Sequence, residues 1–261
     1  GMPSAHRAVA AIHAQHAWSG NADRFGEATA ILAGDLCLQW TDEVYSTSGL
    51  PAEHLARGRA TFDRMRTQLM GGQFLDMLES VRTWEGRSTD ERIAAARKVI
   101  RFKSAKYTIE QPLLIGALAG GVDPAAVPGL SGYGLALGEA FQLRDDLLGV
   151  FGDPEQTGKP AGDDVREGKR TVLIAYTLDV ADAGQRAELT RSFGRADVDV
   201  AGIESVRGII RATGAVERVE SDITRLTHAA THALGEPAAY LQPEASTVLG
   251  ELVALATDRV T

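Results

Sequence analysis

Apolar residues recur at intervals of three and four along most of the chain, which is the spacing of one face of an α-helix. Within residues 24–45, for example, Ile31, Leu32, Leu36 and Cys37 follow this spacing. Alternating runs, Asn-Gly turns and β-branched clusters, which would indicate strands, are nearly absent. Alanine, leucine, arginine and glutamate, which favour helices, are abundant. The pattern predicts an all-α fold.

Glycine, proline and capping residues divide this pattern into helices. Ser88 followed three residues later by Glu91 predicts a capping box at one helix start. We expect helices over residues 24–45, 51–78, 88 onward, 106–119 with an interruption at Pro112, 130–151 and 169–180, and then three more up to the C-terminus. No charged linker and no regular repeat separates them, so we predict a single all-α domain over residues 1–261.

Charge and composition exclude several functions. The 261 residues include 35 acidic and 27 basic side chains, for a formal charge of -8, so a general nucleic-acid-binding surface is not expected. The longest apolar stretches, such as residues 112–122, are far shorter than the ~20 residues of a membrane span. Cys37 is the only cysteine, which excludes a disulfide framework. We expect a cytoplasmic protein without a membrane-spanning segment.

Two pairs of adjacent carboxylates mark residues 139–171 as the chemically distinctive part of the chain. Asp145 and Asp146 end an apolar-rich helical run, and Asp163 and Asp164 follow a loop rich in glycine, proline and aspartate. Carboxylate oxygens are the ligands that a hard cation such as Mg²⁺ prefers. The pattern predicts that this stretch binds a diphosphate through magnesium.

The neighbours of these carboxylates fit the same chemistry. Lys159 and Lys169 bracket the second pair and would hold phosphate oxygens as point charges. Helical spacing places Gln142 on the face of the first pair. One turn further on, Gly149 has two interpretations: a lost carboxylate, or space for another group to approach.

Several other patterns do not by themselves indicate a functional site. An isolated Asp-Asp pair is usually solvated, and only the whole stretch makes a site. The loop differs from a nucleotide-binding P-loop, because Pro160 follows the lysine and a helix precedes the loop. His228 and His232 have the spacing of a helical metal pair, but without a third ligand we expect an exposed helix face. Asp35, in an apolar run, is expected to be a buried structural residue.

The stretch FQLRDDLLGVFGDPEQTGKPAGDDVREGKRT resembles the second aspartate-rich motif, and the lysine-bearing loop after it, of the trans-type isoprenyl (polyprenyl) diphosphate synthases. GMPSAHR and ATAILAGDLCLQWTDE resemble the segment after the first aspartate-rich motif of that family. GGQFLDM resembles a family helix motif, and FKSAKYT resembles the family's KT…Y element with Ser104 in place of threonine. The resemblance covers most of the chain and weakens after about residue 215.

This resemblance implies a helical bundle of the isoprenoid synthase type with a central active-site cavity. It implies an enzyme that condenses isopentenyl diphosphate with an allylic diphosphate to make a longer trans-polyprenyl diphosphate, such as farnesyl or geranylgeranyl diphosphate. The reaction would proceed by ionisation, condensation and elimination with Mg²⁺ as cofactor. The resemblance also implies a homodimer.

The resemblance assigns roles to matching residues. Those that would bind the metal are Asp145, Asp146 and Asp164. Those that would contact the allylic diphosphate or the reacting carbons are Gln73, Asp76, Lys103, Ser104, Phe141, Gln142, Lys159 and Lys169. Phe141 would offer an aromatic face to cationic charge.

Two departures from the family pattern keep alternatives open. Gly149 stands where the second motif has its third aspartate, and we expect the first aspartate-rich motif and the isopentenyl-binding basic residues to lie upstream of Gly1. A non-catalytic partner or regulatory subunit of such a synthase is therefore an alternative. A terpene cyclase is less favoured, because the Asn/Asp-rich metal motif with Ser and Glu is not found. Product length cannot be predicted.

Overall fold

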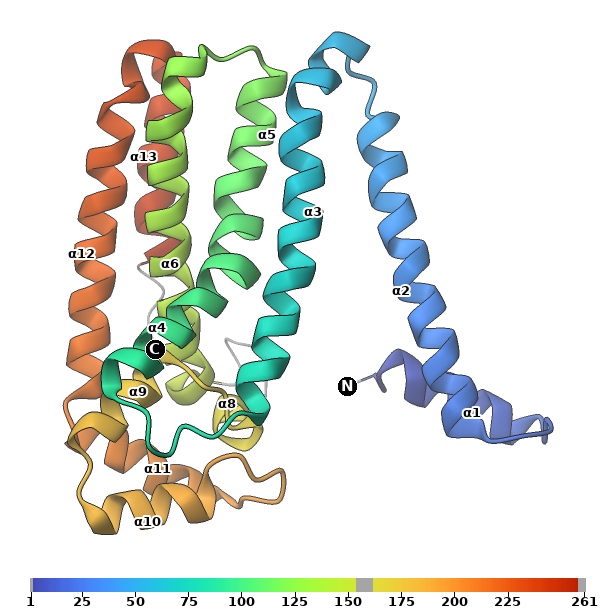
Figure 1. Cartoon of the computed structure of the whole chain (residues 1–261), viewed down its shortest axis with the longest axis vertical. Coiled ribbons are helices and arrows are strands. Elements are labelled where there is room, and N and C mark those ends of the chain that lie inside the picture. The colour runs from blue at the N-terminus through green and yellow to red at the C-terminus, as the bar shows by residue number, and fades with distance from the viewer. Residues whose placement is uncertain (1, 154–161, 258–261) are drawn as a thin grey trace. The chain divides into compact units, whose positions relative to one another are not determined.

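The computed structural model describes residues 2–153 and 162–257, and these residues form helices and connecting loops without a strand. The predicted all-α fold is therefore confirmed (Figure 1). The chain divides into two compact units, Gly1–Leu55 and Ala56–Thr261. The single domain expected over residues 1–261 stays a prediction.

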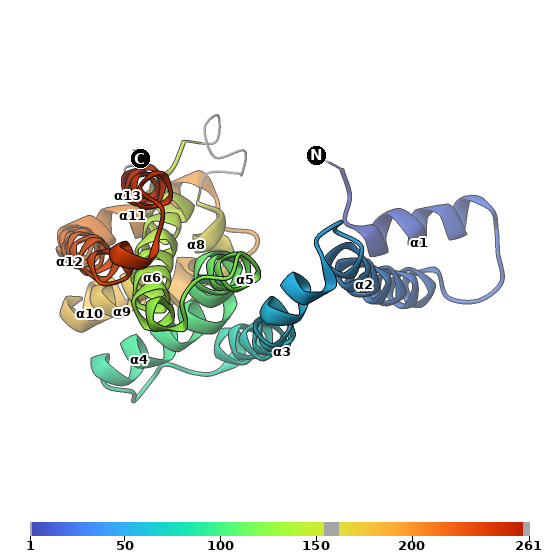
Figure 2. The same cartoon turned by 90° about the horizontal axis from the view of Figure 1, so that it is seen from above.

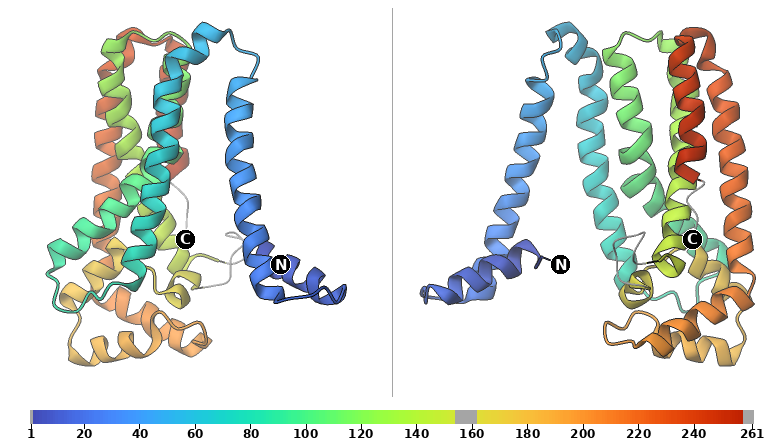
Figure 3. Two further views of the ribbon diagram at one scale, coloured as in Figure 1. Left: turned by 45° about the vertical axis from the view of Figure 1, so that its right-hand side comes forward. Right: turned by 180° about the vertical axis from the view of Figure 1, so that it is seen from behind.

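The first unit is built from two helices, α1 (Ala5–Gln15) and α2 (Ala22–Ser46), which pack against each other (Figure 3). The side chain of Asn21 accepts a hydrogen bond from the backbone nitrogen three residues on and so begins α2. Gly26 allows α1 to approach closely, because a Cβ there would lie only 2.2 Å from the carbonyl oxygen of His6.

The second unit holds most of α3 and all later helices. Their bounds are Ala52–Val81 (α3), Thr89–Val99 (α4), Ile100–Glu110 (the π-helix η1), Gln111–Ala119 (α5), Pro124–Ala126 (η2), Val127–Phe151 (α6), Asp163–Glu167 (α8), Val172–Val180 (α9), Ala183–Ser192 (α10), Val200–Ala212 (α11), Ala215–Gly235 (α12), Pro237–Tyr240 (η3) and Pro243–Thr257 (α13).

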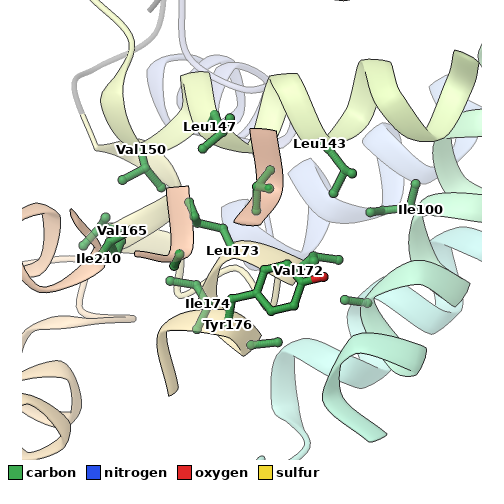
Figure 4. Packing of buried hydrophobic residues seen from close by; sticks show 14 of the residues in the cluster. Ile100, Leu143, Leu147, Val150, Val165, Val172, Leu173, Ile174, Tyr176 and Ile210 are labelled. Carbon is green, nitrogen blue, oxygen red and sulfur yellow. The ribbon is translucent and has the colours of Figure 1, made fainter. Parts of the chain in front are cut away.

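Helix α6 lies at the centre of this unit, in contact with η1, α5, α8, α9, α12 and α13 (Figures 1 and 2). Its side chains Leu143, Leu147 and Val150, spaced at helical intervals, are buried against Leu173 and Ile174 of α9 (Figure 4). Because these side chains occupy one face of α6, the polar residues between them are directed elsewhere.

Glycines let η1 lie directly on α6. A Cβ at Gly134 would lie 2.5 Å from Cα of Glu110, and a Cβ at Gly138 would lie 2.5 Å from Cα of Ala105. Any side chain at these positions would push the π-helix away. Backbone packing of this kind fixes the position of the residues that η1 carries.

Several predicted helices are confirmed. The helix expected over residues 24–45 is α2, and that expected over 130–151 is α6, which begins slightly earlier at Val127. The capping box is present, with reciprocal hydrogen bonds between Ser88 and Glu91 at the start of α4.

Three details of the prediction were wrong. Pro112 does not interrupt a helix but stands in the first turn of α5, where its missing N–H leaves no hydrogen bond unmade. The helix expected over residues 169–180 begins only at Val172, because the Thr171 side chain accepts a hydrogen bond from the nitrogen of Ile174. Four α-helices, not three, follow α9 in the described residues.

Across residues 2–153 and 162–257, no helix is long and apolar enough to cross a membrane.

Gly138→Ala should lower the free energy of unfolding by about 1–3 kcal/mol, because the added methyl group would overlap the backbone of η1. Gly116→Ala is the matched control: it lies within α5 and its Cβ would meet nothing within 4 Å. This control should raise stability by up to about 1 kcal/mol, as alanine does in a helix. Urea unfolding measures both, and equal effects from the two substitutions would contradict the close packing.

Candidate functional site

A cavity of about 370 Å³ in the second unit collects most of the predicted site residues that the structure describes. It is lined by α3, α4, η1, α6, α8 and the segment before α9. The predicted residues among its lining are Asp76, Lys103, Ser104, Gln142, Asp145, Asp146, Asp164 and Lys169.

An ammonium group joins the two carboxylate pairs. Lys169 Nζ lies 2.9 Å from Asp146 Oδ1 and 3.4 Å from Asp164 Oδ2. Both aspartates are buried, with 3% and 8% of their surfaces exposed. Gln142 Nε2 donates to Asp146 Oδ1 at 2.9 Å and to Asp145 Oδ2 at 3.3 Å. The cluster thus holds three carboxylates on one side of the cavity.

Burial and the neighbouring charges shift the pKa values of this cluster in opposite directions. Burial raises the pKa of Asp146, and the nearby Lys169 pulls that pKa down. Burial also raises the pKa of Asp164 from its ordinary value of 3.8 to about 6, against the same lysine. For Lys169, burial alone would lower the pKa, but Asp146 and Asp164 outweigh it and raise the pKa. The lysine therefore stays charged.

The short helix α8 brings Asp164 to this place. Gly162 and Gly168 flank it with φ values of 70° and 66°, in the left-handed region that glycine adopts without strain. The sequence pattern predicted a carboxylate pair here but not a helix.

Lys103, on η1, adds a second ammonium group to the lining of the cavity. Its Nζ lies 2.5 Å from Asp76 Oδ2, so η1 and α3 are joined by an ion pair at the site. Gly72 of α3 permits this approach, since a Cβ there would lie 2.6 Å from the backbone nitrogen of Lys103. Ser104 lines the same cavity.

The remaining predicted residues fall elsewhere. Phe141 is half-buried and Gln73 is exposed, and neither lines this cavity. Lys159 lies outside the described residues. Asp35 was expected to be buried but is exposed on α2, because the apolar residues around it are exposed as well. His228 and His232 are exposed on α12, as expected.

Sequence reasoning missed how the charges pair. It assigned Lys169 and Lys103 to phosphate, whereas in the structure each is paired with a carboxylate. Asp163 also lines the cavity. The clustering of acidic and basic residues was the available signal, but spacing alone does not show which charges meet.

The carboxylate oxygens of this cavity fit a magnesium ion whose coordination shell is completed by phosphate oxygens of the substrate. In the described residues, no group of three or more His, Cys, Asp or Glu side chains is arranged to enclose a metal. Mg²⁺, however, keeps several waters and is commonly held by one or two carboxylates together with phosphate oxygens. The oxygens of Asp146 and Asp164 already surround one positive charge, that of Lys169. Asp145, Asp146 and Asp164 could therefore hold the ion, directly or through water, once phosphate oxygens complete its coordination.

Comparison with known proteins identifies the family. A family model described as polyprenyl synthetase matches residues 7–210. The chain therefore belongs to the polyprenyl synthetase family, which confirms the resemblance seen in its motifs.

Individual relatives support the same family assignment. The chain is 34% identical to the geranylfarnesyl diphosphate synthase of Aeropyrum pernix over 200 residues, which cover 76% of this chain and 59% of that protein. It is 30% identical to the geranylgeranyl diphosphate synthase of Sulfolobus acidocaldarius, over 72% of this chain and 56% of that protein. The chain thus spans less than two thirds of these curated relatives.

The structure has a similar counterpart among solved structures. The geranylgeranyl pyrophosphate synthase of Corynebacterium glutamicum, crystallised with isoprenyl diphosphate and magnesium, superposes with a TM-score of 0.87 and is 42% identical. The match covers 99% of this chain and 71% of that protein. This likeness confirms the predicted helical bundle of the isoprenoid synthase type.

Asp164 should make the metal-free chain less stable as pH rises from about 4 to about 6. In that window the folded chain keeps a proton that the unfolded chain has released, because the pKa is about 6 in the fold and ordinarily 3.8. The contribution is fully present below pH 4 and lost above pH 6. It amounts to up to about 3 kcal/mol, at about 1.36 kcal/mol per pKa unit.

Urea unfolding of the wild-type chain and of Asp164→Asn between pH 3.5 and 7, as round values on either side of the window, isolates this effect. The variant carries no titrating group at position 164, so its stability relative to the wild type should rise through the window. Parallel pH profiles of the two proteins would contradict the raised pKa.

Proposed function

We propose that this protein is a prenyltransferase that condenses isopentenyl diphosphate with an allylic diphosphate to make a longer trans-polyprenyl diphosphate. The observation that supports this most strongly is the single cavity that joins the Asp145, Asp146 and Asp164 carboxylates to the Lys103 ammonium. Carboxylates for a metal and an ammonium for phosphate oxygens are what an allylic diphosphate requires. Membership of the polyprenyl synthetase family supports the same reaction.

In this proposal Asp145, Asp146 and Asp164 would hold magnesium. When bound, magnesium neutralises the charge that develops on a departing diphosphate. Gln142 orients the carboxylates of Asp145 and Asp146, since its amide nitrogen donates to both. Lys169 pairs with the carboxylates of Asp146 and Asp164 and so holds the two carboxylate pairs together.

Lys103 would bind the allylic diphosphate by exchanging its Asp76 partner for phosphate oxygens. Because Lys103 Nζ is paired with Asp76 Oδ2, the exchange costs one ion pair and returns another. Ser104, next to it on η1, would donate its hydroxyl. Lys159 and Gln73 would contribute to the same diphosphate, and Phe141 would stabilise the allylic cation.

We also propose a cytoplasmic homodimer. Of the 25 residues of α2, only Gly26 is buried, while Ile31, Leu32 and Val44 are 66%, 67% and 69% exposed. Large apolar side chains exposed along a helix in this way are typical of a surface that another chain covers. The net charge of -8 and the single free Cys37 are compatible with a reducing cytoplasm.

Product formation from isopentenyl diphosphate and an allylic diphosphate, with magnesium and with chelator, tests the function. Elongation that requires magnesium would support the transferase. A chain that binds the allylic diphosphate without elongating it would contradict the transferase and favour the partner-subunit alternative.

Asp145→Ala should reduce magnesium-dependent turnover by about 100- to 1,000-fold, because a charge-stabilising group at the leaving diphosphate is lost. Its fold should survive, since this side chain is only half-buried. Glu251→Ala, an exposed carboxylate on α13, is the control and should retain full turnover. Unchanged turnover in Asp145→Ala would show that Asp145 does not bind the metal.

Lys103→Met should lower kcat/KM for the allylic diphosphate by about 10- to 100-fold, the worth of one charged hydrogen bond. Methionine keeps most of the length of the side chain and removes the ammonium group with its charge and its hydrogen-bond donors. Lys98→Met, at an exposed position on α4, is the matched control and should leave kcat/KM unchanged. Equal kinetics of the two variants would show that Lys103 does not hold the diphosphate.

A further inference from the structure

The carboxylate of Asp164 rests directly on α6 at Gly149. A Cβ added at Gly149 would lie 2.3 Å from Oδ2, 2.4 Å from Cγ and 2.9 Å from Oδ1 of Asp164. Real Cβ atoms essentially never approach other heavy atoms within 3.0 Å. A side chain at position 149 and the present position of Asp164 therefore exclude each other.

Gly149 stands on the face of α6 that carries the first carboxylate pair. It follows Asp145 by four residues and Asp146 by three, the spacings that align side chains along a helix. It is also the position at which the aspartate-rich stretch departs from the family pattern. The structure thus decides between the two interpretations of this glycine: the space is filled by another group, the carboxylate that α8 supplies.

The backbone at Asp164 has little freedom to retreat from Gly149. The next residue, Val165, is fully buried in the core beside Ile210 (Figure 4). The Val165 carbonyl accepts a hydrogen bond from the nitrogen of Gly194 at 2.8 Å, and the Asp164 carbonyl accepts one from the nitrogen of Lys169 at 3.1 Å. Because α8 is fixed by these contacts, a side chain at position 149 would have to displace the carboxylate itself.

We propose that Gly149 is a positioning residue, which admits Asp164 as the third carboxylate of the metal site. This rests on the proposed function, since that function supplies the metal. It has an unexpected consequence: restoring the aspartate of the family pattern with Gly149→Asp damages the site, because the new carboxylate displaces the one already there.

Binding of Mn²⁺ in the presence of inorganic diphosphate, followed by the electron paramagnetic resonance signal of free Mn²⁺, tests this without any turnover. Gly149→Ala should weaken Mn²⁺ binding about 10- to 100-fold, the usual effect of disturbing the support of a ligand. Gly208→Ala is the matched control, a glycine within α11 whose Cβ would meet nothing within 4 Å. It should bind Mn²⁺ as the wild type does.

Thermal unfolding of the metal-free chain supplies a second readout. Alanine usually stabilises a helix relative to glycine, so Gly208→Ala should raise Tm. Gly149→Ala should lower Tm despite the same change. In an Asp164→Ala background the cost of Gly149→Ala should vanish, because the overlapping carboxylate is gone, and this double variant should fold even if Gly149→Ala alone does not.

The aspartate exchange completes the test. Gly149→Asp should weaken Mn²⁺ binding in the wild-type background, yet strengthen it relative to Asp164→Ala when combined with that substitution, because α6 then supplies the third carboxylate.

The outcomes separate the two proposals. Failure of the wild-type chain to bind Mn²⁺ with diphosphate would overturn the proposed function and the metal role of Asp164 with it. Wild-type binding that Gly149→Ala leaves unchanged, together with a Tm that rises as in Gly208→Ala, would overturn the positioning role alone. A cost of Gly149→Ala that persists in the Asp164→Ala background would do the same.

Discussion

The site depends on one half-buried cation among carboxylates. Lys169 Nζ bonds Asp146 on α6 and approaches Asp164 on α8, and without its positive charge two buried aspartates would face each other. Removing one partner from such a cluster leaves an uncompensated buried charge, which is strongly destabilising. In the proposed function, this cluster binds a divalent cation for the same reason. Its oxygens are already gathered around positive charge, and a metal ion with phosphate would meet the need that the lysine now meets.

Close backbone packing brings Lys103 and Ser104 to the same cavity as this carboxylate cluster. Gly134 and Gly138 let η1 lie on α6, and Gly72 lets α3 approach η1 at Lys103. A π-helix is rare and is frequently found at functional sites. Here it carries Lys103 and Ser104 to the cavity that the α6 carboxylates also line. Glycine therefore has the same use at several points of the site: it allows a neighbouring group to occupy the space of a side chain.

Much of the fold followed from local patterns. The helix α2, the capping box at Ser88 and the long apolar run of α6 each depend on residues close together in sequence, and each was found as expected. The errors have equally local causes that pattern reading underrates. Thr171 delays the start of α9 by capping it, and Pro112 is accommodated because the first turn of a helix needs no N–H from it. Asp35 was misplaced because an apolar run does not reveal whether anything covers it.

The sequence by itself determined the helical class, the family and the residue types of the site, because helix periodicity and an ordered motif are properties of neighbouring residues. Only the tertiary structure decided which charges meet. Lys169 pairs with Asp146 from 23 residues away, and Lys103 pairs with Asp76 from 27. The role of Gly149 also depends on the tertiary structure. The sequence shows that a side chain is missing there, but only the packing shows that the Asp164 carboxylate occupies its space. Contacts between distant segments are set by packing, and spacing along the chain does not encode them.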